Sequence, residues 1–500
     1  MPTPVLRLTN TLTRQLEPVK TAEPGHLKFY SCGPTVYSYA HVGNFRTFLT
    51  ADLIVRTAEA LGWRVSFVTN ITDVGHLTED DVADASGEDK MEKALKSKEG
   101  EAFQNVWDLA RHYADAFLED WDRIRLRRPM VFPRATEHMR EQIVAVEELI
   151  QKGHAYATEK GVYFRILSYP EHGALSGNRD KDQLLVGVRD VVQDEEKEHP
   201  GDFALWKVDD KHLMQWHSPW GWGFPGWHIE CSVMAMKYLG ETIDLHGGGE
   251  DLVFPHHESE IAQSECLTGH TFCPHWIHTR FLQVNGEKMS KSKGNFYTLR
   301  DLVDGRGIDP VAVRYALIAT PYGKPSNLTD QGLRDAARNV ERIRECRRQI
   351  SSSIEKALPG DNTLGSELDR IYEEALEAMC NDLNTSVAIA SLLGGVSAVF
   401  RELTAGLSHA SATSAASFLD KMDALLGLAP SEELTAAAAS SSSEPEIEGK
   451  PISTWIEERQ AAKKAKDFAL ADTIRDKIDA AGYELRDTPE GVVWKAKVRD

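Results

Sequence analysis

Residues 245–260, LHGGGEDLVFPHHESE, combine three glycines, a proline and a run of histidines and acids, which is unusual material for a protein core. His256 and Glu260 are four residues apart, so their side chains would share one face of a helix. A histidine and a carboxylate at this spacing can bind one metal ion, and Cys32 or Cys231 could complete a tetrahedral zinc site. The spacing does not select these cysteines, and this stretch alone is better explained as a helix N-terminus with solvated histidines.

The three glycines suggest a second kind of chemistry. ETIDLH (241–246) predicts a buried strand, and GGGED then predicts a loop at its carboxyl end, where open parallel sheets bind their ligands. Without side chains in the way, the backbone of such a loop can approach a flat base or a phosphate closely. The stretch matches neither GxGxxG nor a P-loop, so a turn that requires a positive φ is an equally good interpretation.

Two further segments contain residues suited to phosphate chemistry. HVGN lies between a predicted strand and a predicted helix, where His41 can donate a hydrogen bond to a phosphate and Gly43 permits close approach. In KMSKS, Lys288 and Lys291 suit a mobile cationic loop that closes over a leaving pyrophosphate. Each segment alone could be a solvated loop, but the combination in this order is specific.

A parallel sheet is the element expected to bring these segments together. LKFYSC (27–32) predicts a buried strand, 45–62 predicts a helix, and RVSFVTNIT (64–72) predicts a second strand, which is the spacing of a βαβ crossover. Residues 130–222 are interrupted by Gly, Pro and Trp and hold shorter strand patterns, so they predict an insertion in the sheet domain. Helical periodicity dominates from about 326 to 428.

The last part of the chain changes character. Residues 430–449 are rich in Ser, Ala and Glu and predict a flexible linker. The residues that follow regain helical periodicity and finish in a short strand pattern, GVVWKAK. A small separate module is therefore expected at the C-terminal end.

Composition restricts the class of protein. Five hundred residues, 41% hydrophobic and 27% charged, suggest about three globular domains. The net charge of −20 argues against bulk nucleic-acid binding, although local basic patches could engage a polyanion. The N-terminus lacks an apolar leader pattern and no long apolar run occurs, so neither secretion nor a membrane span is expected. Six cysteines without a CxxC motif indicate a reduced, cytoplasmic chain.

With these motifs in place, the sequence resembles the class I aminoacyl-tRNA synthetases. HVGN corresponds to their HIGH signature, and KMSKS is identical to their second signature. CGPTVY, NITDV, GWHIEC, HGGGEDLVFPHHESEIAQSE and KMSKSKGNF match the cysteinyl-tRNA synthetase subgroup. The resemblance begins near residue 27 and continues to the C-terminus.

The resemblance implies an α/β fold in which a Rossmann-type parallel-sheet catalytic domain carries a connective insertion. An α-helical bundle and a small C-terminal α+β anticodon-binding domain follow. The catalytic domain is expected in two halves, 1–129 and 223–255, with the insertion at 130–222 between them. A stem-contact region with the KMSKS loop is expected at 256–325 and the helical bundle at 326–429. The linker at 430–449 and the anticodon-binding domain at 450–500 complete the expected division.

The resemblance also implies a metal and a reason for it. One zinc ion per chain would be held by four ligands, Cys32, Cys231, His256 and Glu260. The sulfur of the substrate L-cysteine would join the ion. An apolar pocket separates near-isosteric substrates by only about 10²-fold, whereas zinc binds a thiolate and serine offers none. Metal selection would make a separate editing domain unnecessary.

The remaining roles are implied in the same way. The amino-acid pocket would be lined by Thr72, Trp227 and His246. ATP, with Mg²⁺, would be held by Gly43, Asn44, Gly247, Gly248, Gly249, Asp251 and Lys291, with His41, Lys288 and Lys291 as catalytic residues. The cysteine carboxylate would attack the α-phosphorus, and the terminal ribose of tRNA(Cys) would then take the acyl group. The tRNA contacts would be Lys463, Phe468, Asp472, Asp487 and Trp494.

Two departures from the family pattern stand out. Asn44 replaces the last histidine of HIGH, which leaves an uncharged amide and weakens the expectation of a phosphate contact there. The segment 75–100 differs from the run of acids found in many members, and no role is assigned to it.

Two alternatives share part of this pattern. A ligase of the same fold joins cysteine to an amino sugar, with the same zinc site and adenylation chemistry but no anticodon reader. The helical bundle and residues 458–494 favour tRNA. A non-enzymatic zinc-binding or tRNA-binding relative would have lost a KMSKS lysine or a metal ligand, and none is lost. A monomer is expected.

Overall fold

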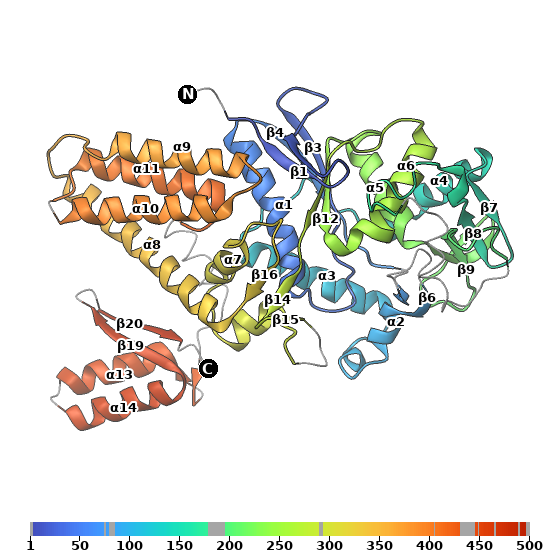
Figure 1. Ribbon diagram of the computed structural model, residues 1–500. Helices are drawn as coiled ribbons and strands as arrows, with labels where there is room; N and C mark the ends of the chain where they lie inside the picture. Colours follow the sequence, from blue (N-terminus) through green and yellow to red (C-terminus); the bar gives the residue numbers. More distant parts are fainter. Residues whose placement is uncertain are drawn as a thin grey trace.

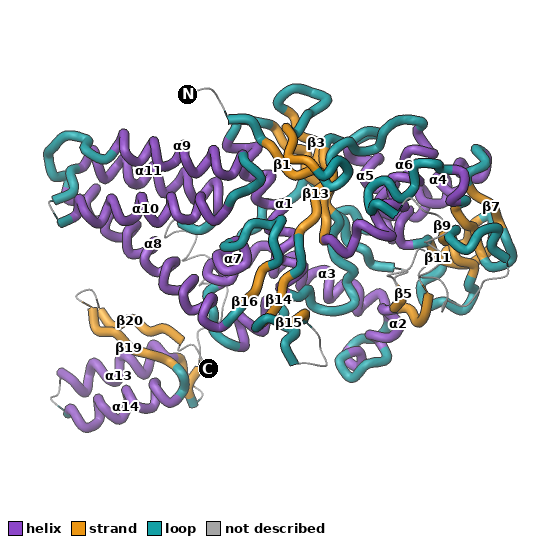
Figure 2. Tube along the Cα trace, in the orientation of Figure 1, coloured by secondary structure: helices purple, strands orange, loops and turns teal. Residues whose placement is uncertain are grey.

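A computed structural model of the chain describes residues 4–74, 77–79, 86–178, 196–289, 294–404, 406–430, 446–448, 450–464, 467–488 and 491–496. Figures 1 and 2 show a central sheet with a strand-rich part on one side and a group of long helices on the other. The sheet is the element that positions the candidate site.

Four parallel strands form this sheet in the spatial order β13-β12-β3-β4. Their bounds are β3 His26–Ser31, β4 Arg64–Thr69, β12 Leu245–Gly249 and β13 Trp276–Thr279. Helix α1, Val42–Ala60, connects β3 to β4, so the predicted crossover and parallel sheet are confirmed. Because the strands run in one direction, their carboxyl ends meet at one edge, where ligands of such sheets bind.

The three glycines lie in strand β12, so the prediction of a loop that starts at residue 247 is wrong. Close neighbours explain why this strand contains glycine. A Cβ on Gly248 would lie 2.7 Å from the His257 ring and 2.9 Å from Leu252. A Cβ on Gly247 would lie 3.1 Å from Ile277 of β13. The glycines allow buried side chains to approach the backbone of the strand.

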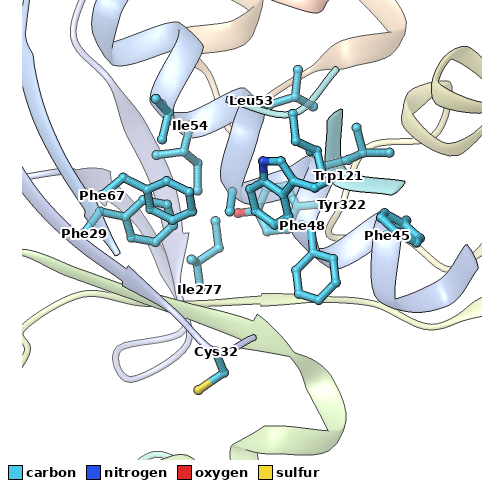
Figure 3. Packing of buried hydrophobic residues seen from close by; sticks show 14 of the residues in the cluster. Phe29, Cys32, Phe45, Phe48, Leu53, Ile54, Phe67, Trp121, Ile277 and Tyr322 are labelled. Carbon is cyan, nitrogen blue, oxygen red and sulfur yellow. The ribbon is translucent and has the colours of Figure 1, made fainter. Parts of the chain in front are cut away.

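Helices cover both faces of the sheet. They are α1, α3 Val106–Arg123, α5 Trp227–Leu239 and α6 Glu258–Thr268, with α1 on one side and α5 and α6 on the other in Figure 1. On the α1 side, Phe29 and Phe67 stack across β3 and β4 with their ring centroids 5.1 Å apart. Phe48 and Trp121 extend this aromatic core. Figure 3 shows Cys32 pointing away from it, toward the other face.

The predicted insertion forms a separate antiparallel sheet of five strands in the order β10-β11-β9-β8-β7. Its strands, with the helix that precedes them, are α4 Met139–Gln151, β7 Ala155–Ala157, β8 Gly161–Phe164, β9 Phe203–Val208, β10 Trp216–Ser218 and β11 Gly221–Pro225. β11 thus runs past the expected boundary at 222. Gly226 then caps α5 and returns the chain to the parallel sheet.

The parallel sheet also extends further along the chain than expected. Strand β13 belongs to it, although the predicted division places residues after 255 in a stem-contact region. A three-stranded sheet with the order β15-β14-β16 follows. These later elements are β14 Leu282–Val284, β15 Glu287–Lys288, α7 Pro310–Ile318 and β16 Ser326–Leu328.

Four long helices make up the helical part, as the periodicity predicts. They are α8 Asp330–Lys356, α9 Gly365–Cys380, α10 Thr385–Leu403 and α11 His409–Leu426. Among the described residues, α10 alone is long and apolar enough to cross a membrane, with a mean hydropathy of 1.4. Core helices pass the same test, and α10 buries Leu392 and Val396 in the bundle.

The C-terminal module has its own small core, formed around Ile452, Trp455 and Ile478. Its main elements are α13 Ile452–Lys464, α14 Phe468–Ala480, β19 Tyr483–Thr488 and β20 Gly491–Ala496. The expected linker falls almost wholly outside the described residues. The remaining short elements are β1 Arg7–Asn10, β2 Gln15–Pro18, β5 Leu77–Glu79, β6 Ser86–Asp89, α2 Lys90–Leu95, β17 Glu446–Ile447 and β18 Lys450–Pro451.

Candidate functional site

The four predicted metal ligands converge at the carboxyl edge of the parallel sheet. Cys32 directly follows β3, Cys231 lies on α5, and His256 and Glu260 lie in the turn before α6 and in its first turn. All four are buried, and their donor atoms lie within 4.8 Å of one another. The two sulfurs are 3.8 Å apart, Cys32 Sγ is 3.5 Å from Glu260 Oε1, and His256 Nε2 is 3.0 Å from the same oxygen.

A second donor set overlaps the first. It keeps Cys32 and Glu260 but takes His246 and His257 as its nitrogen donors. His257 Nε2 is 3.3 Å from Cys32 Sγ, and His246 Nε2 is 3.0 Å from Glu260 Oε2. The sequence reading passed over His257, although it stands beside His256 in the PHHESE stretch. Only the geometry of the turn, which brings both rings inward, identifies His257 as a donor.

Other side chains hold the histidines of both sets in place. His256 Nδ1 lies 2.9 Å from His228 Nδ1, which leaves Nε2 facing Glu260. His257 Nδ1 lies 2.7 Å from His278 Nε2, and His278 Nδ1 lies 2.7 Å from the Thr11 hydroxyl. Such partners fix the orientation of a ring that serves as a ligand.

The charges of the cluster favour metal binding. Burial alone would raise the pKa of Glu260, but the neighbouring His246 and His256 lower it to about 2. A hydrogen bond from the Cys32 thiol and the nearby His256 lower the pKa of Cys231 to about 6, against the effect of burial. Glu260 and Cys231 are therefore the two donors whose ionised forms their neighbours favour. The described residues of this cluster could hold a metal ion.

The expected amino-acid pocket surrounds this cluster. The Trp227 ring lies 4.3 Å from the His256 ring, and His246 stacks on Trp276 with ring centroids 4.3 Å apart. Thr72, just beyond the end of β4, accepts a hydrogen bond from Asn70 through its hydroxyl oxygen at 3.1 Å. The structure thus brings the predicted Thr72, Trp227 and His246 to the same edge of the sheet as the metal donors.

Glu230 is a buried acid in this region that the sequence reading did not single out. It is fully buried on α5, directly before Cys231. Burial raises its pKa well above the usual value, while His256 and Thr72 act in the opposite direction. The signal was present in GWHIEC, where an acid interrupts an otherwise apolar turn next to a predicted ligand.

The HVGN segment forms the start of α1. His41 is the N-cap residue: its Nδ1 accepts the Asn44 N–H at 3.2 Å, and the Asn44 side-chain oxygen accepts the His41 N–H at 3.1 Å. This reciprocal cap gives Asn44 a structural role that an uncharged amide can fill. Because Nδ1 accepts a hydrogen bond, a neutral His41 ring carries its proton on Nε2.

Residues beside the KMSKS loop lie against HVGN. A Cβ on Gly43 would come within 2.7 Å of the Met289 methyl group, and the ring centroids of His41 and Phe296 are 5.1 Å apart. Lys288 lies in β15, with its ammonium 5.5 Å from the Phe281 ring centroid. Lys291 falls within 290–293, outside the described residues.

The glycines of β12 end next to the same helix. A Cβ on Gly249 would be 3.7 Å from the Thr47 hydroxyl of α1 and 2.3 Å from Asp251 Oδ1. Gly249 therefore borders the N-terminal half of α1, and Gly247, Gly248 and Asp251 lie beside it in the same segment. The predicted nucleotide-binding residues that the structure describes thus lie at the start of α1 and at the end of β12, at the carboxyl edge of the parallel sheet.

The predicted tRNA contacts lie apart from this site, in the C-terminal module. Lys463 lies in the last turn of α13, Phe468 begins α14, and Asp472 is exposed on α14 with Arg475 at 3.5 Å. Asp487 and Trp494 lie in β19 and β20, where Leu485 pairs with Trp494 and Asp487 with Val492.

The chain is similar to known proteins in both sequence and fold. The model of the family described as "tRNA synthetases class I (C) catalytic domain" matches residues 18–338, and that of the DALR domain matches residues 376–430. A methionyl-tRNA synthetase of Mycobacterium tuberculosis, bound by methionyl-adenylate, superimposes with a TM-score of 0.59 over 82% of this chain and 93% of its own, at 15% sequence identity. The family model and the fold show a class I tRNA synthetase.

Two similar proteins identify the family within this class. A cysteine–tRNA ligase of Salinibacter ruber is 53% identical over 99% of both chains. A cysteine–tRNA ligase of Chlorobaculum tepidum is 40% identical over 98% of this chain and 99% of its own. The chain belongs to the cysteine–tRNA ligase family.

Proposed function

We propose that the protein activates L-cysteine with ATP, releases pyrophosphate, and transfers cysteine to the 3′-terminal adenosine of tRNA(Cys). The buried cluster of Cys32, Cys231, His256 and Glu260 is the observation that carries this proposal. It lies at the carboxyl edge of the sheet, from which the chain runs from Cys32 into HVGN, so a thiol held there would place its carboxylate toward the nucleotide side. Family membership supports the same activity.

One zinc ion per chain would occupy the first donor set. Two cysteine sulfurs, one imidazole and one carboxylate form a donor set typical of zinc, whereas the overlapping set offers a single sulfur. When bound, zinc supplies a preference for the thiolate of cysteine over the alcohol of serine. His246 then orients Glu260 through the 3.0 Å contact, and His257 and His278 form the wall behind it.

On the nucleotide side, binding and charge stabilisation account for the chemistry. His41 would donate from Nε2 to a phosphate oxygen of ATP, with its Nδ1 fixed by Asn44. Gly43, Asn44, Gly247, Gly248, Gly249 and Asp251 would form the ATP site, with Mg²⁺ on the phosphates. Lys288 and Lys291 would stabilise the departing pyrophosphate. The cysteine carboxylate is itself the nucleophile, so the protein needs none.

The C-terminal module would read the tRNA anticodon through Lys463, Phe468, Asp472, Asp487 and Trp494. A hollow between α13 and α14, lined by Trp455, Leu470 and Lys477 among others, offers apolar and cationic surface to an unpaired base. Removing the chain after residue 446 should leave cysteine-dependent pyrophosphate exchange nearly intact and severely weaken tRNA charging. If the shortened and full chains aminoacylated tRNA equally well, the module would not read the anticodon.

The central experiment compares substrates for the adenylation step. Pyrophosphate exchange should depend on cysteine and proceed far more slowly with serine at equal concentration. Aminoacylation of tRNA(Cys) should then follow. The alternative ligase, which joins cysteine to an amino sugar, would show the same exchange but would transfer cysteine to the sugar and leave tRNA uncharged.

We further propose that the enzyme acts as a cytoplasmic monomer. All six cysteines are buried and free, as a reducing compartment allows. Light scattering in solution should give the mass of one chain, 55.8 kDa. A stable mass of twice this value would contradict the monomer.

A further inference from the structure

Glu230 is a fully buried carboxylate, and neither of its oxygens has a hydrogen-bond partner of good geometry among the described residues, although the Thr72 hydroxyl is near enough to act on it. Buried polar groups are almost always hydrogen-bonded, because their desolvation otherwise costs free energy without compensation. Such a group in a folded enzyme requires an explanation. One explanation is that the hydrogen-bond partner of this carboxylate arrives with the substrate.

The surroundings of Glu230 place it between the metal cluster and the amino-acid pocket. The groups that act on its carboxylate are Cys231, Asp73, His256 and Thr72. The carboxylate therefore lies between the end of β4 and the first turn of α5. Both the proposed metal ligands and the pocket threonine are its neighbours.

The other acid on this wall already has partners. Asp73 accepts the Thr136 N–H at 3.0 Å through Oδ1 and the Thr136 hydroxyl at 2.8 Å through Oδ2. Thr72 receives the Asn70 amide on its hydroxyl oxygen, which leaves its hydroxyl proton as a single donor that can act on Glu230. Glu230 is the acid in this group that has acceptor capacity for an incoming cation.

We infer that Glu230 binds the α-ammonium group of the substrate amino acid. This inference rests on the proposed function, in which the cysteine thiolate is held by the Cys32–Cys231–His256–Glu260 cluster. In cysteine, only the β- and α-carbons separate the sulfur from the ammonium nitrogen. A thiolate held beside Cys231 therefore brings the ammonium into the immediate neighbourhood of residue 230. The charge pair also leaves the substrate carboxylate as the group that faces ATP.

The decisive measurement compares two thiols by calorimetry without ATP. Cysteine carries the ammonium, and 3-mercaptopropionate has the same thiol and carboxylate without it. Glu230→Gln keeps the shape and removes the acid that can carry a negative charge opposite the ammonium. It should weaken cysteine binding by on the order of 10- to 100-fold, as expected for a charged hydrogen bond, and change 3-mercaptopropionate binding little. Equal weakening of both thiols, or of neither, would overturn the inference.

Two further variants separate binding from folding. Glu230→Asp keeps the charge on a shorter side chain and should bind cysteine more tightly than Glu230→Gln; equal or weaker binding than Glu230→Gln contradicts the inference. Glu265→Gln, a matched change on α6 whose carboxylate accepts the Tyr169 hydroxyl at 2.5 Å, should leave cysteine binding unchanged. Zinc content and circular dichroism of each variant show whether the site and fold remain.

The outcomes also distinguish this inference from the proposed function. If the unaltered protein fails to support cysteine-dependent pyrophosphate exchange, the proposed function fails. If it supports exchange and Glu230→Gln binds cysteine as tightly as the unaltered protein, the ammonium site alone is wrong. If wild-type protein binds 3-mercaptopropionate as tightly as cysteine, no ammonium site exists in this pocket.

Discussion

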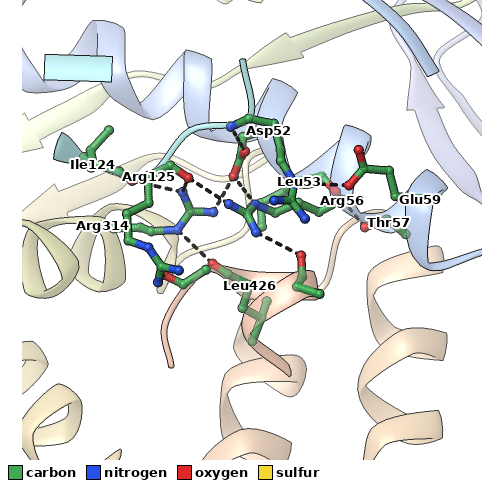
Figure 4. A network of polar contacts seen from close by, with 12 residues as sticks. Asp52, Leu53, Arg56, Thr57, Glu59, Ile124, Arg125, Arg314 and Leu426 are labelled. Carbon is green, nitrogen blue, oxygen red and sulfur yellow. Dashed lines mark hydrogen bonds and ion pairs between the residues drawn. The ribbon is translucent and has the colours of Figure 1, made fainter. Parts of the chain in front are cut away.

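The protein has two buried groups of charged side chains, one centred on α1 and the other on α5 and α6. They differ in how completely their polar atoms are hydrogen-bonded. Figure 4 shows the first, centred on Asp52. Asp52 accepts hydrogen bonds from Arg56 Nε at 2.7 Å, from the Arg127 N–H at 2.6 Å and from the Arg314 guanidinium. Arg314 donates its other hydrogen bonds to carbonyl oxygens, including that of Leu426 at 2.8 Å.

The metal-donor cluster has the opposite character. Its sulfurs and carboxylate oxygens face one another, and atoms around it, such as Glu230 Oε1 and Oε2, His246 Nδ1 and Gln263 Nε2, have no hydrogen-bond partner among the described residues. A network that satisfies its own charges holds elements together. A cluster that leaves several buried polar atoms without partners is built for something that binds there.

The largest effect should come from removing a donor of the cluster. Cys231→Ser replaces a sulfur ligand, so zinc should no longer co-purify stoichiometrically and its affinity should fall by more than the ~10–100-fold typical of losing a group that only orients a ligand. Metal analysis and competition with a chelating dye measure this. Cys380→Ser, a buried thiol of α9, is the matched control and should retain zinc. Full zinc content in Cys231→Ser would remove Cys231 from the site.

The next effect concerns the network in Figure 4. Asp52→Asn leaves Arg56 and Arg314 buried without their anion, which should lower the free energy of unfolding by about 3–5 kcal/mol. Urea unfolding followed by circular dichroism measures the change. Zinc content should stay at the unaltered level, because the donor cluster lies on the other face of the sheet. Loss of zinc with normal stability would reverse the roles assigned to the two groups.

The same carboxylate gives a pH dependence with a defined sign. Burial acts against it, but Arg314 and Arg56 lower the pKa of Asp52 below its usual value. The contribution of Asp52 to stability is therefore fully present above about pH 4, the unfolded pKa, and is lost as the pH falls through the folded pKa. The stability difference between the unaltered protein and Asp52→Asn should be constant near neutrality and shrink below pH 4. A difference that grows with acid would contradict the pairing.

The smallest effect is expected at the surface. Arg128 and Asp122 form an ion pair with 56% and 51% of their side chains exposed. Solvent and salt screen such pairs, so Arg128→Ala should change the free energy of unfolding by less than about 1 kcal/mol. Urea unfolding at low and high salt should show this small change vanish. If Arg128→Ala lowered the free energy of unfolding as much as Asp52→Asn, burial would not explain the difference between the two ion pairs.

Sequence patterns predicted the elements that depend on local periodicity. The strands at 27–32 and 64–72, the helix between them and the long helices after 326 agree with β3, β4, α1 and α8–α11. The metal donors were nominated from residue type and from the resemblance, and the structure brings them together at one edge.

Other features depend on contacts that no local pattern encodes. The Asp52–Arg314 pair joins residues 262 positions apart. The glycines of β12 look like a loop in sequence because the His257 ring that requires them arrives from a later segment. Glu230 looks like a favourable acid at a helix start, and only its burial without a partner singles it out.

Helix α1 connects the Asp52 network to the HVGN segment. Its first residue follows His41, and its later turns carry Asp52 and Arg56, which hold the carbonyl groups at the end of α11 through Arg56 and Arg314. An unbroken helix of this kind is about 28 Å long and behaves as a stiff rod. If the helical bundle tilts about this anchor, α1 would move with it and displace the His41 imidazole. The position of the bundle would therefore bear on the residue that we propose to contact ATP.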